Sequence, residues 1–364
     1  MLGPLEGSCK VTTLEISDIL DAVRNGAQAT SQDVVKLLSA EGREMEELFA
    51  EAREVRDRQF GKHVFAYGFV YFSTYCHNNC TFCYYRRTNS IDRYRKSPEE
   101  IISLAADLKD AGIDLVDLTM GEDEHMYADD YSELLEIISG VKKLGISIMA
   151  SPGAVKKEAM PKIKAAGVDF YAVYQETHNR DLYSKLRLEQ DFDFRYNQRV
   201  WAREAGMLTE DGMMVGLGES MEDRADAILT MGAEKCEQIR CMTFVPQAGT
   251  PLQTLEPMDS YMELKSIAVM RILFPDRFIP ATLDVEGIEG MKSRLDAGAS
   301  TITSIVVPHR HLAGVAQPEK DIESGGRSVQ HVFDLVADMG KRIATQNEFR
   351  SMIDKLEERI RPKP

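Results

Sequence analysis

The sequence lacks an excess of positive charge. Its 364 residues contain 44 Lys and Arg against 59 Asp and Glu, which gives a formal net charge of −15 at pH 7. Proteins that bind nucleic acid in a groove usually carry clustered positive charge, so this balance argues against a nucleic-acid partner. Apolar residues make up 43% and charged residues 28%, an ordinary globular composition that excludes bulk disorder.

The sequence also lacks a long apolar run of the kind that spans a membrane. The longest stretch without Asp, Glu, Lys or Arg extends from His63 to Tyr85, and it carries Ser73, Thr74 and several other polar residues. It therefore fails as a bilayer helix. The start, MLGPLEGSCK, has neither the basic region nor the long apolar core of a secretory signal. We expect a cytoplasmic protein with no membrane partner.

Cysteine is scarce, since 364 residues contain only 6. Six cysteines in a chain of this length do not form a disulfide framework, which agrees with a reducing compartment. Three of the six lie close together, at Cys76, Cys80 and Cys83. Cys9, Cys236 and Cys241 are isolated, and we interpret them as packing residues.

No low-complexity linker divides the chain, and from residue 64 onward short β-rich runs alternate with helical patterns. Eight such units predict a single α/β fold, a (β/α)8 TIM-type barrel, and the alternative is an open doubly wound sheet. In a barrel, the catalytic residues lie at the C-terminal ends of the strands. The predicted strands are 65–72, 115–120, 147–150, 170–174, 212–216, 239–244, 278–283 and 301–306.

Helical patterns lie between the strands and on both sides of the barrel. The clearest helix start is Ser97, Pro98 and Glu100, which combine an N-cap, a first-turn proline and a capping box. The first 60 residues show apolar spacing typical of helices. We therefore predict an N-terminal helical extension at 1–62, the barrel at 63–312, and a C-terminal helical segment at 313–364 that packs on the barrel.

The three clustered cysteines follow the first predicted strand as Cys76-x3-Cys80-x2-Cys83. This spacing allows one short loop to surround a single inorganic centre, but a structural zinc site or an ordinary ferredoxin cluster needs four protein ligands. A [4Fe–4S] cluster held by three cysteines would leave one iron open for an external ligand. The alternatives are a zinc site with His77 as the fourth ligand, or three unrelated buried thiols.

This cysteine motif, placed after the first barrel strand and with Phe82 before its last cysteine, resembles the signature of the radical S-adenosylmethionine (SAM) enzymes. The resemblance implies that the amino and carboxylate groups of SAM chelate the open iron. One electron from the cluster then cleaves SAM to a 5′-deoxyadenosyl radical. It also implies an electron donor such as ferredoxin or flavodoxin. In such enzymes the cofactor does the difficult chemistry while the protein binds, orients and excludes water.

The same resemblance implies several SAM-binding residues. Gly121 and Glu122 follow the second strand where the family has a Gly-Gly-Glu-like turn, although Met120 here replaces the first glycine. Ser151 follows the third strand where the family has a polar side chain near the cofactor, and a turn cap is its ordinary alternative. Phe82 in the cysteine motif completes this part of the expected cofactor site.

Glu176, at the end of the fourth strand, matches the glutamate that holds the SAM ribose in relatives such as biotin synthase. Arg195, nineteen residues further on, matches the arginine that binds the SAM carboxylate. A guanidinium group with bidentate geometry suits a carboxylate. Arg187 lies nearby in the sequence and is the alternative for that role.

Polar residues at other strand ends form a candidate substrate site: Asp117, Arg240, Asp284 and Ser304. Unpaired charges that face a barrel interior cost several kcal/mol, so we expect either a charged ligand or an internal Asp–Arg ion pair to meet them. One arginine and two aspartates complement a molecule with one carboxylate and two ammonium groups, which is a diamino acid.

Longer segments resemble the methylornithine synthase branch of the family, which consists of lysine mutases in pyrrolysine biosynthesis. They include YGFVYFSTYCHNNCTFCYYRRTN, YAVYQETHNRDLY and ATLDVEG. This resemblance implies conversion of L-lysine to (3R)-3-methyl-D-ornithine by hydrogen abstraction, Cα–Cβ fragmentation and recombination. It implies no catalytic residue beyond the cofactor radical.

In that reaction Arg240 would hold the carboxylate of lysine, Asp284 and Ser304 the α-amino group, and Asp117 the side-chain ammonium. The alternatives are a biotin synthase-like or hydrogenase-maturation-like enzyme with another small substrate, and a non-enzymatic iron–sulfur electron carrier.

Overall fold

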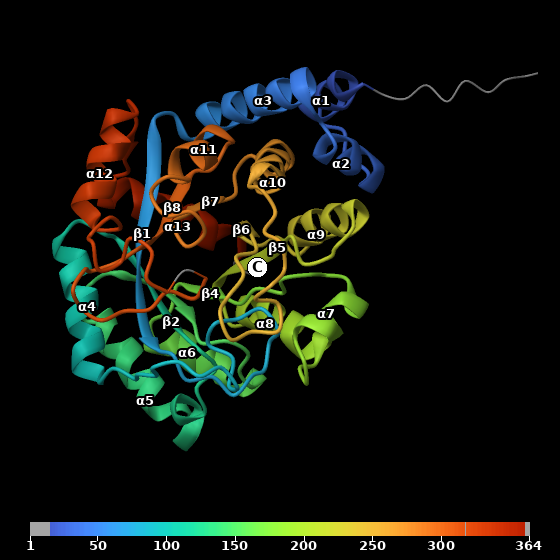
Figure 1. Ribbon diagram of the computed structural model, residues 1–364. Helices are drawn as coiled ribbons and strands as arrows, with labels where there is room; N and C mark the ends of the chain where they lie inside the picture. The colour runs from blue at the N-terminus through green and yellow to red at the C-terminus, as the bar shows by residue number, and fades with distance from the viewer. Residues whose placement is uncertain (1–14, 317, 361–364) are drawn as a thin grey trace, which may run out of the picture.

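A computed structural model of the chain describes residues 15–316 and 318–360. Cys9 lies outside these residues. The strands form a central barrel and the helices surround it (Figure 1). The prediction of a (β/α)8 barrel is confirmed, and the alternative of an open doubly wound sheet is wrong.

The barrel wall is a parallel sheet with the strand order β6-β5-β4-β3-β2-β1-β8-β7. The two strands at the ends of this order meet through a parallel bridge between Gln238 and Phe278. There the N–H of Phe278 donates to the Glu237 carbonyl over 3.0 Å. The strand bounds are β1 (His63–Ser73), β2 (Leu115–Met120), β3 (Ser147–Ser151), β4 (Phe170–Ala172), β5 (Leu208–Val215), β6 (Gln238–Thr243), β7 (Pro280–Thr282) and β8 (Thr301–Ile305).

The strands are buried on both faces. Every residue of β1 except His63 is buried, and all residues of β2, β4, β7 and β8 are buried as well. Continuous burial is typical of parallel strands covered by helices on one face and packed side chains on the other. This explains why the strands appear in the sequence as apolar runs without strict alternation.

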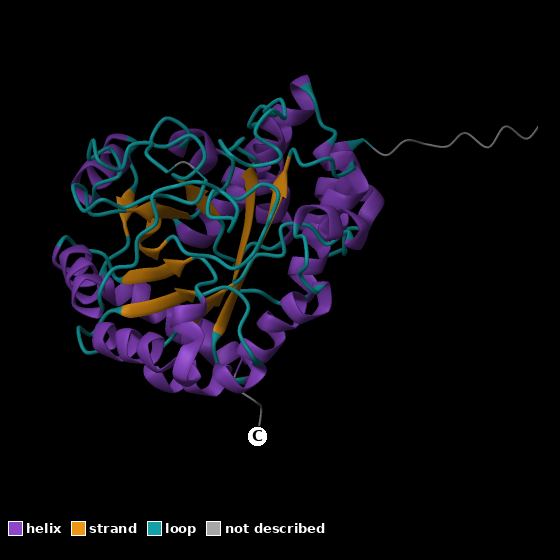
Figure 2. Ribbon diagram, turned by 60° about the horizontal axis from the view of Figure 1, so that its bottom comes forward, coloured by secondary structure: helices purple, strands orange, loops and turns teal. Residues whose placement is uncertain are grey.

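The helices form an outer layer around the strands (Figure 2). The capping box at the start of α4 is confirmed, because Ser97 Oγ accepts from the Glu100 N–H and the Glu100 carboxylate accepts from the Ser97 N–H. The bounds are α1 (Ile16–Arg24), α2 (Ser31–Leu38), α3 (Gly42–Phe60), α4 (Pro98–Asp110), α5 (Glu124–Lys142), the 3-10 helix η1 (Lys157–Ala159), α6 (Met160–Ala166), α7 (Arg180–Leu186), α8 (Phe192–Glu204), α9 (Met221–Ala233), α10 (Tyr261–Leu273), α11 (Met291–Asp296), α12 (Val329–Asp338) and α13 (Gln346–Ile360).

The segments before and after the barrel both contact its N-terminal end. Helix α2 packs on α9 and α3 packs on α10. Phe60, at the end of α3, stacks on Phe278 with the ring centroids 6.5 Å apart. From the other side, strand β9 (Arg342–Ile343) pairs with the start of β1, and Phe349 lies 5.9 Å from Phe65. These contacts cover the end of the barrel opposite the C-terminal strand ends.

The fifth strand begins earlier than predicted. The sequence predicts a start at Gly212, whereas β5 begins at Leu208 and includes the acidic residues Glu210 and Asp211. Both acids are fully buried and paired, Glu210 with Arg240 and Asp211 with Arg199. Ion pairs therefore allow two buried charged residues within the strand, although their polar character in the sequence is typical of a loop.

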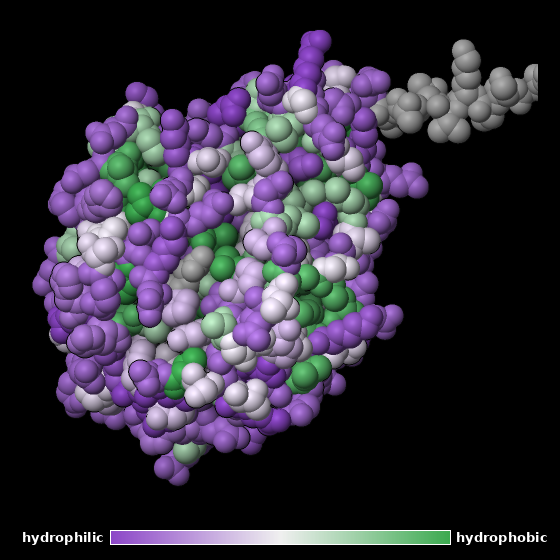
Figure 3. Space-filling view, in the orientation of Figure 1, coloured by the Kyte–Doolittle hydropathy of each residue, from purple (hydrophilic) through white to green (hydrophobic). Residues whose placement is uncertain are grey.

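Figure 3 shows hydrophilic residues over most of one face, with hydrophobic residues in scattered patches. Among the helices that the structure describes, none has the length and apolar character needed to cross a bilayer.

Candidate active site

Cys76, Cys80 and Cys83 lie in the loop that follows β1. This loop returns to β1 through an antiparallel bridge between Ser73 and Arg95. Burial is the main cause that raises the pKa of the Cys76 thiol to about 12 and the pKa of the Cys83 thiol still further. Repulsion by Cys80 adds to both shifts, and Cys83 packs against the small buried cluster that contains Cys80. A cationic centre is what would hold such thiols together as thiolates.

Gly121 brings the end of β2 against the cysteine loop. A Cβ atom at Gly121 would lie 2.2 Å from the Tyr75 carbonyl oxygen and 2.9 Å from Cys76 Cβ. The N–H of Gly121 also donates to the Ser73 carbonyl over 2.9 Å. The close approach that requires glycine here is therefore to the backbone that carries Cys76.

Glu122 is buried beside the same loop. Its Oε1 accepts from Arg195 Nη1 over 2.8 Å, and its Oε2 lies 3.5 Å from His77 Nε2. The structure thus brings together Glu122 from the turn after β2 and Arg195 from α8. Two residues that the sequence analysis assigned separately to SAM form one ion pair.

Glu176 follows β4 and lines the barrel cavity. Its Oε1 accepts from Arg187 Nη2 over 2.9 Å, whereas Oε2 is buried without a hydrogen-bond partner. Its backbone has a φ of 68°, in the left-handed region that residues other than glycine seldom adopt. Burial raises the pKa of Glu176, while Arg187 and Arg195 oppose the rise.

The two candidate arginines occupy neighbouring positions. Arg187 and Arg195 both donate to the Tyr174 carbonyl, over 3.3 and 2.8 Å. Arg187 also contacts Cys80 Sγ at 3.5 Å, and its guanidinium carbon lies 5.4 Å from the centre of the buried Phe82 ring. Arg187 therefore joins the cysteine loop to Glu176, while Arg195 joins Glu122 to the end of β4.

Asp117 and Ser151 face each other inside the barrel. Ser151 Oγ donates to Asp117 Oδ1 over 2.7 Å, and Asp117 Oδ2 is buried without a partner. The Asp117 side chain lines the same cavity as Glu176 and Cys83, so it does not point outward. Burial raises the pKa of the Asp117 carboxyl to about 7.

Arg240, on β6, is anchored within the barrel. Its Nε donates to Glu210 Oε1 over 2.8 Å and its Nη2 to the Tyr67 hydroxyl over 2.9 Å. Its Nη1 makes a long contact of 3.4 Å with Thr303 Oγ1. Arg240 lines the cavity, so its guanidinium group is held at a fixed place in the wall.

Asp284 and Ser304 meet beyond the ends of β7 and within β8. Ser304 Oγ donates to Asp284 Oδ2 over 3.1 Å, and the Tyr71 hydroxyl contacts both carboxylate oxygens at 2.9 Å. Arg327 Nη1 donates to Asp284 Oδ1 over 2.7 Å. Ser304 has a φ of 68°, so a second strand end at this site has strained backbone.

Of the two expectations for these charges, a charged ligand or an internal ion pair, the structure shows ion pairs at Arg240 and Asp284, although with partners that the sequence did not indicate. Arg240 already pairs with Glu210 and Asp284 with Arg327. Glu210 could not be selected as a site residue because the predicted strand starts at Gly212, whereas in the structure Glu210 lies within β5. Arg327 follows Gly325-Gly326, far from any strand, and no sequence signal points to it.

Comparison with known families matches residues 70–231 to the model of the Radical SAM superfamily. That span begins within β1 and ends within α9, and it contains the cysteine loop. Membership of this superfamily implies SAM and a [4Fe–4S] cluster as cofactors.

Relatives of the whole chain are similar over most of their length. The 3-methylornithine synthase of Methanosarcina barkeri is 43% identical over 347 residues, which cover 94% of this chain and 99% of that protein. The [FeFe] hydrogenase maturase subunit HydE of Thermotoga maritima is 35% identical, over 71% of this chain and 74% of HydE. The crystal structure of a methylornithine synthase, PylB, superposes with a TM-score of 0.87 at 43% identity, over 92% of this chain and 99% of that one. The chain belongs to the radical SAM superfamily and, within it, to the family of the 3-methylornithine synthases.

Proposed function

We propose that this protein is a radical SAM mutase that isomerises L-lysine to (3R)-3-methyl-D-ornithine in pyrrolysine biosynthesis. Its near full-length similarity to 3-methylornithine synthases supports this activity. The competing proposals are a biotin synthase-like or hydrogenase-maturation-like reaction on another small substrate, and an electron carrier without enzymatic activity. The charges inside the barrel distinguish them.

The proposed cluster ligands are Cys76, Cys80 and Cys83, with SAM on the open iron. Their place in one loop after β1 fits a three-thiolate centre. Two buried polar atoms beside the loop, Glu176 Oε2 and Arg187 Nε, have no hydrogen-bond partner among the described residues, and they fit a polar ligand. When bound, the cluster and SAM together supply the 5′-deoxyadenosyl radical. The residues of the chain would bind and orient the cofactors and the substrate, and would shield them from water.

The proposed SAM contacts follow from this arrangement. Gly121 and Glu122 lie beside Cys76 and would meet the methionyl amino group. The free Oε2 of Glu176 would accept from the ribose hydroxyls. Arg187 and Arg195 lie where a carboxylate could be held, and both are fixed by the Tyr174 carbonyl. Ser151 and Phe82 line the same cavity as Glu176 and would complete the SAM site.

The observation that carries the proposal is the balance of charge around the cavity. Several buried carboxylates near the cavity and the cysteine loop each pair with an arginine, whereas Asp117, which lines the cavity, has no ion-pair partner among the residues that the structure describes. The matched pairs are Glu122–Arg195, Glu176–Arg187, Glu210–Arg240 and Asp284–Arg327, at 2.8, 2.9, 2.8 and 2.7 Å.

A cavity with one unmatched carboxylate favours a substrate with one net positive charge, because an uncompensated buried charge is costly. Lysine, with two ammonium groups and one carboxylate, has that charge. A substrate that carries only a carboxylate, as a biotin synthase-like reaction would need, leaves two unmatched negative charges. The charge balance therefore favours lysine over the competing enzyme proposals, and an electron carrier needs no such cavity.

We assign the substrate contacts accordingly. Asp117 would take the side-chain ammonium, since its Oδ2 is free. Asp284 and Ser304 would hold the α-amino group, and Arg240 the carboxylate through its Nη1 edge, where its contact is weakest. Anchors at both ends would keep the two lysine fragments in place between cleavage and recombination, and apolar walls such as Phe69 and Phe244 exclude water.

The reaction also needs a one-electron donor, and we propose a small redox protein such as ferredoxin or flavodoxin. The iron–sulfur part is tested by anaerobic reconstitution. We expect iron in the protein and a cluster spectrum that changes when SAM is added. A protein without iron, or a spectrum that does not change with SAM, would contradict the radical SAM mechanism. A cluster whose spectrum does not change with SAM would favour the iron–sulfur electron carrier.

The role of substrate charge is tested by comparing the effects of three amino acids on the reaction. These are lysine, norleucine, which lacks the side-chain ammonium of lysine, and glutamate. We expect lysine alone to accelerate 5′-deoxyadenosine formation by the reduced, reconstituted protein. Equal stimulation by norleucine would refute the role of the unmatched carboxylate. No stimulation by any of the three would favour a substrate of the biotin synthase or maturase kind.

A further inference from the structure

Glu176 has an unusual backbone at the junction between β4 and β5. Strand β4 ends at Ala172, and the chain pairs with β5 again through a bridge between Glu176 and Met213. The N–H of Glu176 donates to the Gly212 carbonyl over 2.9 Å, and the N–H of Met214 donates to the Glu176 carbonyl over 2.9 Å. Because the φ of Glu176 is 68°, its surroundings must hold this conformation.

Asp211 fills the space where the two strands separate. Its Oδ1 accepts from the N–H of Gln175 over 2.9 Å and from the N–H of Gly212 over 2.7 Å. Gln175 directly precedes Glu176 in the chain. Gly212 is the residue whose carbonyl accepts from the N–H of Glu176. Asp211 is fully buried, and its neighbour Glu210 is the residue that reaches Arg240 inside the barrel. Successive strand residues point to opposite faces, so Asp211 points away from the cavity.

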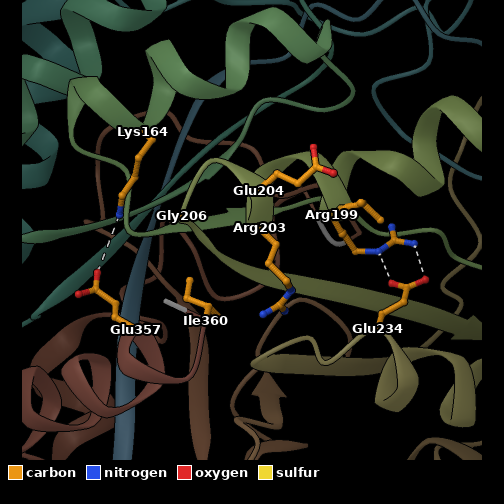
Figure 4. Close-up of a pocket in the computed structure, with 9 residues that line it drawn as sticks. Lys164, Arg199, Arg203, Glu204, Gly206, Glu234, Glu357 and Ile360 are labelled. Carbon is orange, nitrogen blue, oxygen red and sulfur yellow. Dashed lines mark hydrogen bonds and ion pairs between the residues drawn. The ribbon is translucent and has the colours of Figure 1, made fainter. Parts of the chain in front are cut away.

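A charged network holds Asp211 in turn. Its Oδ2 lies 3.3 Å from Arg199 Nη2 and 3.1 Å from His178 Nε2. Although burial acts in the other direction, Arg199 and His178 hold the pKa of Asp211 below its ordinary value. Arg199 also binds Glu234 over 2.7 Å, and Figure 4 shows this ion pair at the edge of a surface groove.

The same side chains could be taken for a metal site, because ligand atoms of His178, Asp211 and Glu234 lie within 4.8 Å of one another. The Arg199 guanidinium contacts both carboxylates and so takes the place of a cation. With the guanidinium between the two carboxylates, the position of a metal ion is already filled. The network therefore has a different role.

We propose that Asp211 is a positioning residue that fixes the left-handed backbone of Glu176 and thereby presents the Glu176 carboxylate to SAM. This inference rests on the proposed contact between Glu176 and the SAM ribose. Asp211 would touch neither SAM nor substrate. It would act through two backbone N–H groups that flank Glu176.

The test compares Asp211→Ala with Glu237→Ala in the reconstituted protein. Glu237 is a matched control, because it also accepts from a strand N–H (Thr209, 2.9 Å) and pairs with an arginine of α8 (Arg203, 2.8 Å), but at the start of β6. SAM affinity is measured from the change in the electron paramagnetic resonance spectrum of the reduced cluster as SAM is added. Iron content and thermal unfolding are measured on the same samples.

Both variants should unfold at a lower temperature and keep their iron. Only Asp211→Ala should weaken SAM binding, by about tenfold, because a displaced Glu176 loses much of a hydrogen bond to a charged group. Asp211→Asn keeps an oxygen acceptor for both N–H groups, so its Kd for SAM should return to within about threefold of the parent.

Equal SAM affinity in Asp211→Ala and Glu237→Ala would overturn the inference. So would an Asp211→Asn variant as defective as Asp211→Ala, because charge rather than backbone hydrogen bonding would then be responsible. Glu176→Gln is measured alongside them. If it binds SAM normally, the proposed role of Glu176 itself fails; if it is defective while Asp211→Ala is normal, only the positioning role fails.

Discussion

Asp117 is a buried carboxylate whose replacement should change stability and turnover in opposite directions. In the protein without substrate its pKa rises from 3.8 to about 7 because of burial. At about 1.4 kcal/mol per pKa unit, this rise corresponds to about 4 kcal/mol of lost stability once the group is ionised. The loss is absent below the unfolded-state pKa, grows between about pH 4 and pH 7, and is complete above pH 7.

Asp117→Asn should therefore raise the free energy of unfolding at pH 8 by up to about 4 kcal/mol. The amide keeps an acceptor for Ser151, so the hydrogen bond of 2.7 Å survives. For a chain of this length the expected rise in Tm is roughly 5 °C, measured by anaerobic thermal unfolding without lysine. At pH 5 the difference should be smaller, because the parent carboxyl is then protonated.

The same substitution should impair lysine turnover. An ammonium group that loses its carboxylate partner forfeits a charged hydrogen bond, so KM for lysine should rise roughly tenfold to hundredfold. Asp169→Asn is the control, because that buried carboxylate has a partner, Lys142, at 3.0 Å and should lose stability when neutralised. An Asp117→Asn variant with unchanged Tm and unchanged KM would refute the reasoning.

Three further predictions follow from the same contacts. The value of kcat/KM for lysine should fall about fivefold between pH 7 and pH 6 as Asp117 takes up a proton, and it should be flat across that range in Asp117→Asn. Arg327→Met leaves Asp284 buried without its cation and should cost about 3–5 kcal/mol in urea unfolding; the double variant Asp284→Asn/Arg327→Met should recover most of that loss, and failure to recover would contradict the pairing. Gly121→Ala places a Cβ 2.2 Å from the Tyr75 carbonyl oxygen and should lower the iron bound per chain. The control Gly140→Ala meets only the end of the Ile102 side chain, at 2.4 Å, and should keep its iron. Equal iron content in the two variants would contradict the role given to the close approach at Gly121.

Most of the fold was predictable because its signals are local. The strands of a barrel are buried on both faces, so they appear as short apolar runs, and helix starts such as Ser97 have side-chain caps that act within one turn. The start of β5 was not predictable in this way. Glu210 and Asp211 are compatible with a buried strand only because Arg240 and Arg199 lie opposite them, and those partners are distant in the sequence.

The candidate site, like the fold, was predictable from the sequence only in part. Residues at strand ends, such as Asp117 and Glu176, could be selected from the barrel topology, and the structure brings them to one cavity. Which of them carries an unmatched charge could not be predicted. The pairing of these carboxylates depends on Arg327, which reaches Asp284 from a segment beyond β8. It depends also on Arg187 and Arg195, whose acidic partners are determined by the tertiary structure.

The central claim, a lysine mutase, is tested most directly by following lysine labelled with ¹³C and ¹⁵N at every position. The reduced, reconstituted protein is incubated with SAM and this lysine, and the amino-acid products are analysed by mass spectrometry and NMR. The account predicts a branched isomer of unchanged mass that retains every labelled atom. Formation of 5′-deoxyadenosine while lysine stays unchanged, or a product that has lost or gained an atom, would contradict it.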